Sequence, residues 1–172
     1  MNNFFVRFCL FFATIFGFIF LLVWAYLSIV APANAAEPLA QVEAQAKTVV
    51  FDSAHVRVST PYGGSHDFKV EVATSFAQLR QGLMNRTELA PNRGMLFKYN
   101  PPRTVGMWMK NTLIPLDMLF ADRLGRVVFI AENTVPMSED IIQAPGRTAY
   151  VLELSAGTVK RLSIALGHRL TF

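Results

Sequence analysis

The chain has 172 residues, enough for one ordinary domain, with 16 Lys and Arg against 12 Asp and Glu. Of these charged residues only Arg7 lies in the first 35 positions, so the remaining 137 carry a net charge of +3. This distribution excludes a polytopic membrane protein and a disordered chain, and the single cysteine excludes a disulfide scaffold. The positive charge is mild and scattered, which argues against a nucleic-acid-binding protein.

The first 35 residues predict an export signal. A short segment carrying Arg7 precedes the uncharged run 8–31, and a small-x-small cleavage site follows at 33–35. The run is longer than an ordinary signal core and reaches the length of about 20 residues that spans a bilayer, so an uncleaved anchor is the alternative. Both predict an exported domain that, in a bacterium, is periplasmic or tethered to the inner membrane facing the periplasm. Residues 36–47, rich in Ala, Gln and Glu, are expected to be a linker.

Residues 48–172 are predicted to form a single, mainly β domain. The clearest strand is 67–73, where apolar residues alternate with charged ones. Residues 122–125 have the composition of a hairpin connection. The other predicted strands are 48–51, 56–58, 94–99, 105–110, 116–121, 126–132, 150–154 and 167–172.

Two short helices interrupt these strands. Thr74 is the predicted N-cap of the first helix, in which Phe76, Leu79 and Leu83 would lie on one face. Ser155 is the predicted N-cap of the second. Many short strands with only two short helices predict a compact antiparallel β-sandwich or barrel rather than a parallel α/β sheet.

The segment 104–117 and the run 150–154 contain a candidate binding site. If 105–110 is a strand, Trp108 and Lys110 share a face, and Gly106 on that face leaves space beside the indole ring. Pairing with 116–121 would bring Asp117 to the same surface. The predicted ligand-binding residues are Trp108, Lys110, Asn111, Asp117, Glu153 and, from the first helix, Arg80.

An aromatic ring flanked by donors and carboxylates is typical of a surface that binds a polar small molecule such as a carbohydrate. Glu153 lies in an otherwise apolar run, where a charge is rarely buried without a partner. The plainer interpretation is structural. Trp108 would then be a core residue, and Lys110 would pair with Asp117 or Glu153 only to satisfy a buried charge.

An envelope hydrolase is one alternative function. Asp117, Glu132 and Glu153 could supply the acid and the base of glycoside chemistry, which needs two carboxyl groups about 5–10 Å apart. No textual motif of an enzyme is present, however, and no catalytic residue is predicted.

A methionine-based copper protein is the other alternative. Met107 and Met109 share a face of the predicted strand, and thioethers select Cu(I). Convergence of the two sulfur atoms near the surface would support this function, and their burial among Leu116, Phe120 and Phe129 would exclude it. The three histidines are too scattered to predict a zinc site, so neither a metal nor a cofactor is expected.

Several strings in this chain match a known family in order and spacing. They are Gly82-Leu83-Met84, Gly94-Met95-Leu96-Phe97, Trp108-Met109-Lys110-Asn111-Thr112-Leu113-Ile114-Pro115-Leu116-Asp117 and Val151-Leu152-Glu153-Leu154-Ser155-Ala156-Gly157. Over roughly 56–172 the chain resembles the uncharacterised family called domain of unknown function 192. The resemblance implies a compact, mainly antiparallel β-sandwich or barrel behind an N-terminal signal or anchor. It assigns no catalytic residues, because the family has no established activity. Many members have a cysteine after the proline that matches Pro136, whereas this chain has Met137, so a thiol role proposed for the family does not apply here.

Together these observations predict an exported, non-catalytic protein that binds a polar small molecule or a partner protein of the cell envelope. No nucleic acid is expected as a partner. The membrane is expected to be contacted only through the N-terminal segment, if that segment stays uncleaved. The sequence does not predict an oligomeric state.

Overall fold

The computed structural model describes residues 48–61 and 63–172, so the predicted export segment and linker at 1–47 lie outside the described residues. In chain order the elements are β1 (Asp52–Ser59), β2 (Ser65–Ala73), α3 (Phe76–Gln81), β3 (Arg93–Arg103), β4 (Gly106–Met107), β5 (Leu116–Ala121), β6 (Val127–Ala131), β7 (Ile142–Gln143), β8 (Thr148–Ser155), α4 (Thr158–Arg161) and β9 (Arg169–Thr171). Neither helix in this part of the chain is long and apolar enough to span a membrane.

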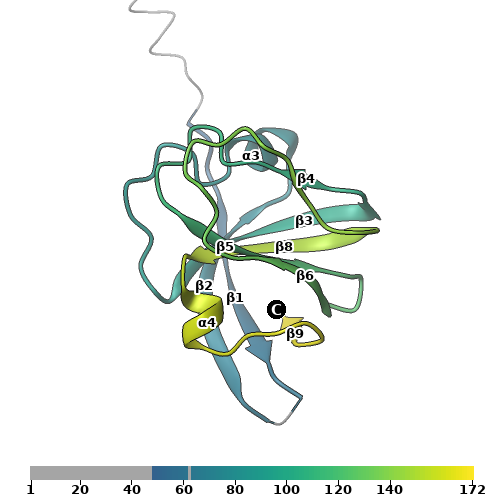
Figure 1. The fold of residues 1–172 in the computed structure, drawn as a ribbon. Helices are drawn as coiled ribbons and strands as arrows, with labels where there is room; N and C mark the ends of the chain where they lie inside the picture. The colour runs from purple at the N-terminus through teal and green to yellow at the C-terminus, as the bar shows by residue number, and fades with distance from the viewer. Residues whose placement is uncertain (1–47, 62) are drawn as a thin grey trace, which may run out of the picture. The chain divides into compact units, whose positions relative to one another are not determined.

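Seven strands form one strongly curled sheet in the order β6-β5-β8-β3-β2-β1-β9, while β4 and β7 form a separate two-stranded sheet. Figure 1 shows α3 and β4 toward one end of the fan of strands and α4 with β9 toward the other. The outer strands also approach each other, because the amide of Val127 donates to the carbonyl of His168, and the amide of Leu170 to that of Gly125. The sheet is therefore a half-barrel whose two edges are linked by a few backbone hydrogen bonds.

The expected purely antiparallel sheet is wrong at one pair of strands. β2 and β3 run parallel, with Val70 opposite Gly94, whereas the other ladders are antiparallel. The segment between these strands, which contains α3, carries the chain back to the starting end of the sheet, so that β3 runs in the same direction as β2. The sheet is consequently mixed, and the crossover places α3 beside the end of β3.

The element boundaries differ from the predicted ones in several places. The residues 48–51 are not a strand, and the predicted strand 105–110 shrinks to the two residues of β4. Ser75, not Thr74, caps α3, with Gln78 completing a capping box, and Gly157 rather than Ser155 occupies the N-cap of α4. The hairpin at 122–125 is confirmed, because it joins the antiparallel pair β5 and β6.

Apolar side chains cover both faces of the central strands. Leu119 and Leu152 lie in one core cluster, whereas the neighbouring Met118 and Val151 lie in a second. All six residues of β5 are buried, which explains why this strand shows no apolar–polar alternation in its sequence. The second cluster includes residues of β4 and is partly covered by α3, and this is the face that carries the candidate site.

Candidate functional site

A surface hollow of about 440 Å³ lies between α3, the end of β3 and β4. We call it the outer groove. Three aromatic rings border it, those of Phe76, Tyr99 and Trp108, and two guanidinium groups, those of Arg80 and Arg103. The remaining lining residues are Leu79, Thr104, Val105 and Gly106. Trp108 is 40% exposed, so the alternative expectation that it is a buried core residue is wrong.

A much smaller space of about 30 Å³ lies beneath the C-terminal end of α3, and we call it the inner cavity. Leu79, Arg80 and Trp108 border both the outer groove and the inner cavity, so the two spaces adjoin. Glu153 lines the inner cavity, together with Thr112. A space of this kind holds a water molecule once it exceeds about 10–15 Å³, so the inner cavity has room for a small polar group.

Glu153 is buried on the sheet face that α3 covers. Its side chain is 4% exposed, and in the strand ladders it lies opposite Met95 on β3 and Met118 on β5. Burial raises the pKa of Glu153 to about 8, and no hydrogen bond or counter-ion among the described residues offsets that effect. The group is therefore mostly a neutral carboxylic acid at pH 7, able to donate a hydrogen bond into the inner cavity.

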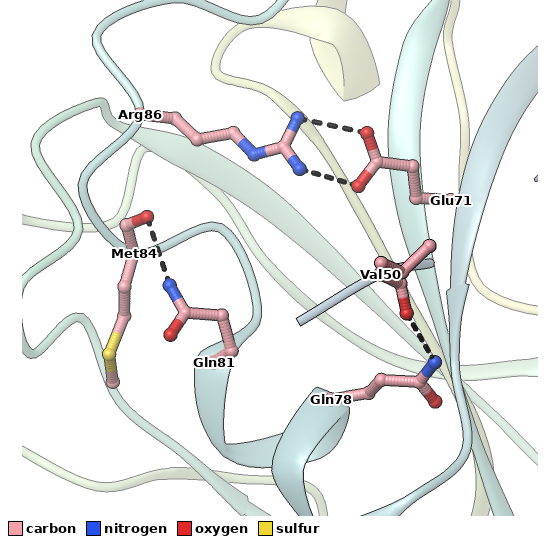
Figure 2. Close-up of polar contacts among 6 residues, drawn as sticks. All are labelled: Val50, Glu71, Gln78, Gln81, Met84 and Arg86. Carbon is pink, nitrogen blue, oxygen red and sulfur yellow. Dashed lines mark hydrogen bonds and ion pairs between the residues drawn. The ribbon is translucent and has the colours of Figure 1, made fainter. Parts of the chain in front are cut away.

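Several polar contacts fix α3 and the turn after it, as Figure 2 shows. The amide Nε2 of Gln78 donates to the carbonyl oxygen of Val50 at 2.8 Å, which ties the helix to the segment before β1. After the helix, Arg86 forms a two-pronged ion pair with Glu71 on β2. Gly82 ends the helix with φ +46°, and a Cβ there would lie 3.2 Å from Phe97. These contacts hold Arg80 at the boundary between groove and cavity.

Lys110 lies beside the groove, whereas Asn111 is not among the residues that line the groove or the inner cavity. The Lys110 ammonium nitrogen lies 5.3 Å from the Trp108 ring centroid and 3.1 Å from a carboxylate oxygen of Glu139. Lys110 therefore pairs with neither Asp117 nor Glu153, contrary to the structural interpretation. Asn111 occupies a turn with φ +54°, and its carbonyl accepts from the Asn85 amide at 2.8 Å.

The sequence predicted that the strand at 105–110 pairs with 116–121 and so brings Asp117 to Trp108. In the structure β4 pairs with β7 instead of β5, so Asp117 lies away from Trp108. Its two oxygens accept from the backbone amides of Asn133 at 2.9 Å and Val159 at 2.8 Å. In the β5–β8 ladder Asp117 is opposite Leu154, one residue out of step with Glu153, so these carboxyl groups point to opposite faces of the sheet. This geometry removes the Asp117–Glu153 pair from the hydrolase alternative, and the third carboxylate considered, Glu132, is exposed after β6.

The methionine sulfurs do not converge at the surface. Met107 and Met109 are 7% and 1% exposed and belong to the core cluster that contains Leu116 and Phe120 and against which Phe129 packs. Their sulfur atoms accept hydrogen bonds from the hydroxyls of Tyr99 and Thr134, at 3.4 and 3.2 Å. The copper-binding alternative is therefore wrong. Within residues 48–61 and 63–172 no group of three or more His, Cys, Asp or Glu is arranged to hold a metal ion.

Only some of the predicted site residues lie together in the structure. Arg80, Trp108 and Glu153 meet around the inner cavity, with Lys110 at the outer side of the ring. Arg103, which lines the groove, was not among the predicted residues. Phe76, expected on one helix face with Leu79 and Leu83, is 79% exposed beside the groove. Gly106 lies beside Ile141, whose Cγ2 would be 2.9 Å from an added Cβ, so its small size accommodates the β4–β7 pair.

Two solved structures from bacteria resemble this chain. A candidate transcription regulator from Sinorhizobium meliloti 1021 is 50% identical, with a TM-score of 0.70, over 72% of this chain and 95% of that one. A protein of unknown function from Novosphingobium aromaticivorans DSM 12444 is 39% identical, with a TM-score of 0.69, over 73% of this chain and 89% of that one. Because the shared part is nearly all of the first relative, that protein folds with little besides this domain, and residues 48–172 are a suitable fragment for experiments.

A comparison with curated proteins found no match. The family model called DUF192, described as uncharacterized ACR, matches residues 58–172, which is well over half of the chain. The match covers every element from the end of β1 to β9, including the groove and the inner cavity. The chain therefore belongs to the DUF192 family.

Proposed function

We propose that the domain binds a polar small molecule, without catalysing a reaction, in the outer groove. In the proposed setting it is exported and lies in the periplasm or is tethered to the inner membrane facing it. The observation that carries this proposal is the exposed Trp108 ring beside the guanidinium groups of Arg80 and Arg103. A flat ring covers an apolar face of a ligand, while guanidinium groups donate to its oxygen atoms. The hollow of about 440 Å³ has the size of a small-molecule site.

The charge of the groove favours an acidic ligand over a neutral sugar. Arg80 and Arg103 line the groove, and none of its lining residues in the described part of the chain is acidic. The Arg103 guanidinium also lies 5.0 Å from the Tyr99 ring centroid, so its planar face is partly covered while its edge stays available. A neutral sugar would stack on the ring but would leave both guanidinium groups without an anion.

A second hollow, of about 500 Å³, lies at the β5–β6 hairpin, but it is the weaker candidate. None of its lining residues is aromatic, and the Arg147 guanidinium there donates to the carbonyl of Pro102. The description of one relative as a transcription regulator does not lead us to propose DNA binding. The predicted export separates this domain from the genome, and its positive charges are scattered.

The test is the thermal stability of residues 48–172 against a panel of envelope sugars, nucleotides, amino acids and organic acids. A ligand that binds only the folded state raises the unfolding midpoint by mass action. We expect a shift that disappears in Trp108→Ala and persists in the matched control Leu124→Ala, which truncates an exposed side chain in the second hollow. If the shift is lost in Leu124→Ala and kept in Trp108→Ala, the ligand does not bind in the outer groove. If no compound shifts the midpoint, binding of a partner protein is favoured over binding of a small molecule.

A further inference from the structure

The inner cavity joins the outer groove to a buried carboxyl group that has no partner among the described residues. Glu153 lines this cavity and is 96% buried, because its exposed fraction is 4%. Arg80 borders both spaces, and so does Trp108. Arg80 and Trp108 therefore lie between a ligand on the indole ring and Glu153. This inference rests on the proposed function, because it concerns the ligand of the same groove.

We propose that the ligand is a carboxylate carried on a flat apolar group, with one carboxylate oxygen in the inner cavity accepting a hydrogen bond from Glu153 while Arg80 neutralises the charge. The flat group would lie in the outer groove against Trp108. The inner cavity, of about 30 Å³, has room for a small polar group such as one carboxylate oxygen.

The protonation of Glu153 decides which ligand chemistry fits. A neutral carboxylic acid donates one hydrogen bond, so it complements an anionic oxygen rather than repelling it. Because burial raises the pKa of Glu153 to about 8, this donor is present at neutral pH. An ammonium ligand would instead need Glu153 ionised, and it would then meet Arg80 at the entrance to the cavity.

If Glu153 donates a hydrogen bond to the ligand, the affinity for the ligand should depend on pH, and few other groups around Glu153 could produce that dependence. α3 contributes Arg80, and β3 contributes Tyr99 and, at the groove, Arg103. Burial and the nearby Glu153 raise the pKa of Tyr99 above its ordinary value, so it stays neutral between pH 7 and 9. β4 contributes an uncharged side chain to the inner cavity, and β5 places another opposite Glu153. The segment after β4 contributes Lys110, which lies outside the cavity beside the Trp108 ring and pairs with Glu139. Glu153 is thus the residue lining the inner cavity whose pKa, about 8, lies between pH 7 and 9.

The experiment titrates phenylacetate and its neutral amide, phenylacetamide, into ¹⁵N-labelled residues 48–172 and follows the backbone and indole resonances. We expect phenylacetate to bind at least tenfold more tightly than phenylacetamide at pH 7, with shifts at the Trp108 indole. Its affinity should fall about tenfold from pH 7 to pH 9, because Glu153 ionises and repels the carboxylate.

Two glutamate variants separate a specific role from a general charge effect. Glu153→Gln keeps the shape and a donor, so it should still bind phenylacetate but lose the change in affinity between pH 7 and 9. Glu139→Gln removes the exposed carboxylate that pairs with Lys110 beside the ring, and it should keep that change. Arg80→Met should weaken phenylacetate at least tenfold and leave phenylacetamide unaffected.

Equal affinities for the acid and the amide, or a pH dependence that persists in Glu153→Gln, would overturn the inference. Either result leaves the proposed function standing if a compound of the panel still shifts the melting point through Trp108. If neither probe nor any panel compound perturbs Trp108, both proposals fail together.

Discussion

Replacing Asp117 should destabilise the fold rather than weaken a ligand. Its carboxylate is completely buried, and its oxygens accept from the amides of Val159, in the first turn of α4, and Asn133, after β6. An asparagine keeps one acceptor but turns an NH₂ group toward the other amide, so one charge-assisted hydrogen bond is lost and one buried N–H is left without an acceptor. A hydrogen bond to a charged group contributes about 1.5–3 kcal/mol, and a buried orphan donor costs about 1–3 kcal/mol. We expect Asp117→Asn to lose about 3 kcal/mol of unfolding free energy, or about 10 °C in midpoint for a domain of this size.

Urea unfolding of residues 48–172, followed by far-ultraviolet circular dichroism, measures this loss. Asp122→Asn is the matched control, because Asp122 also accepts from two backbone amides, those of Leu124 and Arg126, but through a single oxygen in a partly exposed turn. An asparagine keeps that oxygen, so the control should lose less than about 1 kcal/mol. Similar losses in the two variants, or a loss below about 1 kcal/mol for Asp117→Asn, would refute the assigned role.

Two further predictions concern stability. The pKa of Glu153 is raised from 4.5 to about 8, so between these values the folded state keeps a proton that the unfolded chain releases. The stability that this protonated group contributes to the fold is therefore complete below pH 4.5 and is lost as the pH rises to about 8. The difference in unfolding free energy between wild type and Glu153→Gln should change by about 1.4 kcal/mol per pH unit in urea titrations across that window, and parallel curves would contradict the buried acid. Gly125→Ala should cost about 2 kcal/mol more than Gly146→Ala, because both glycines have positive φ but only at Gly125 would the added Cβ meet backbone, 2.2 Å from the carbonyl oxygen of Leu170. Equal urea midpoints in these two variants would argue against the contact that links the sheet edges.

The sequence predicted strands correctly where one face of the strand is apolar. It predicted them incorrectly where the pairing depends on segments that are distant in the chain. Residues 67–73 alternate, and they form the greater part of β2. The run 105–110 reads as a strand, yet β7 offers only two residues with which to pair, so β4 ends at Met107. The parallel pairing of β2 and β3 has no local signature, because it depends on how the segment containing α3 returns the chain to the sheet.

The candidate site was predictable to the extent that single residues conflict with their surroundings. Glu153 was identified because a carboxyl group in an apolar strand is unusual. Trp108 was identified because the alternation of a strand would place its ring on one face with Gly106 and Lys110. Arg103 gave no such signal, since an arginine after a strand is ordinary, and it reaches the groove through the course of β3. The expected meeting of Asp117 with Trp108 failed because it required a strand pairing that periodicity alone does not specify.

Two acidic side chains, Asp117 and Glu153, are buried in the described part of the chain, and they differ in whether a partner satisfies them. Asp117 has two backbone amides, so its charge is satisfied and its burial is explained by the fold. Glu153 lines a cavity and has no partner among the described residues, on a face otherwise filled by apolar and aromatic side chains, where an apolar residue would be more stable at neutral pH. A fold that keeps such a group gives up stability at that position. The ligand binding proposed for the adjoining groove would account for that loss. The missing partner of Glu153 is the strongest argument for placing a ligand there.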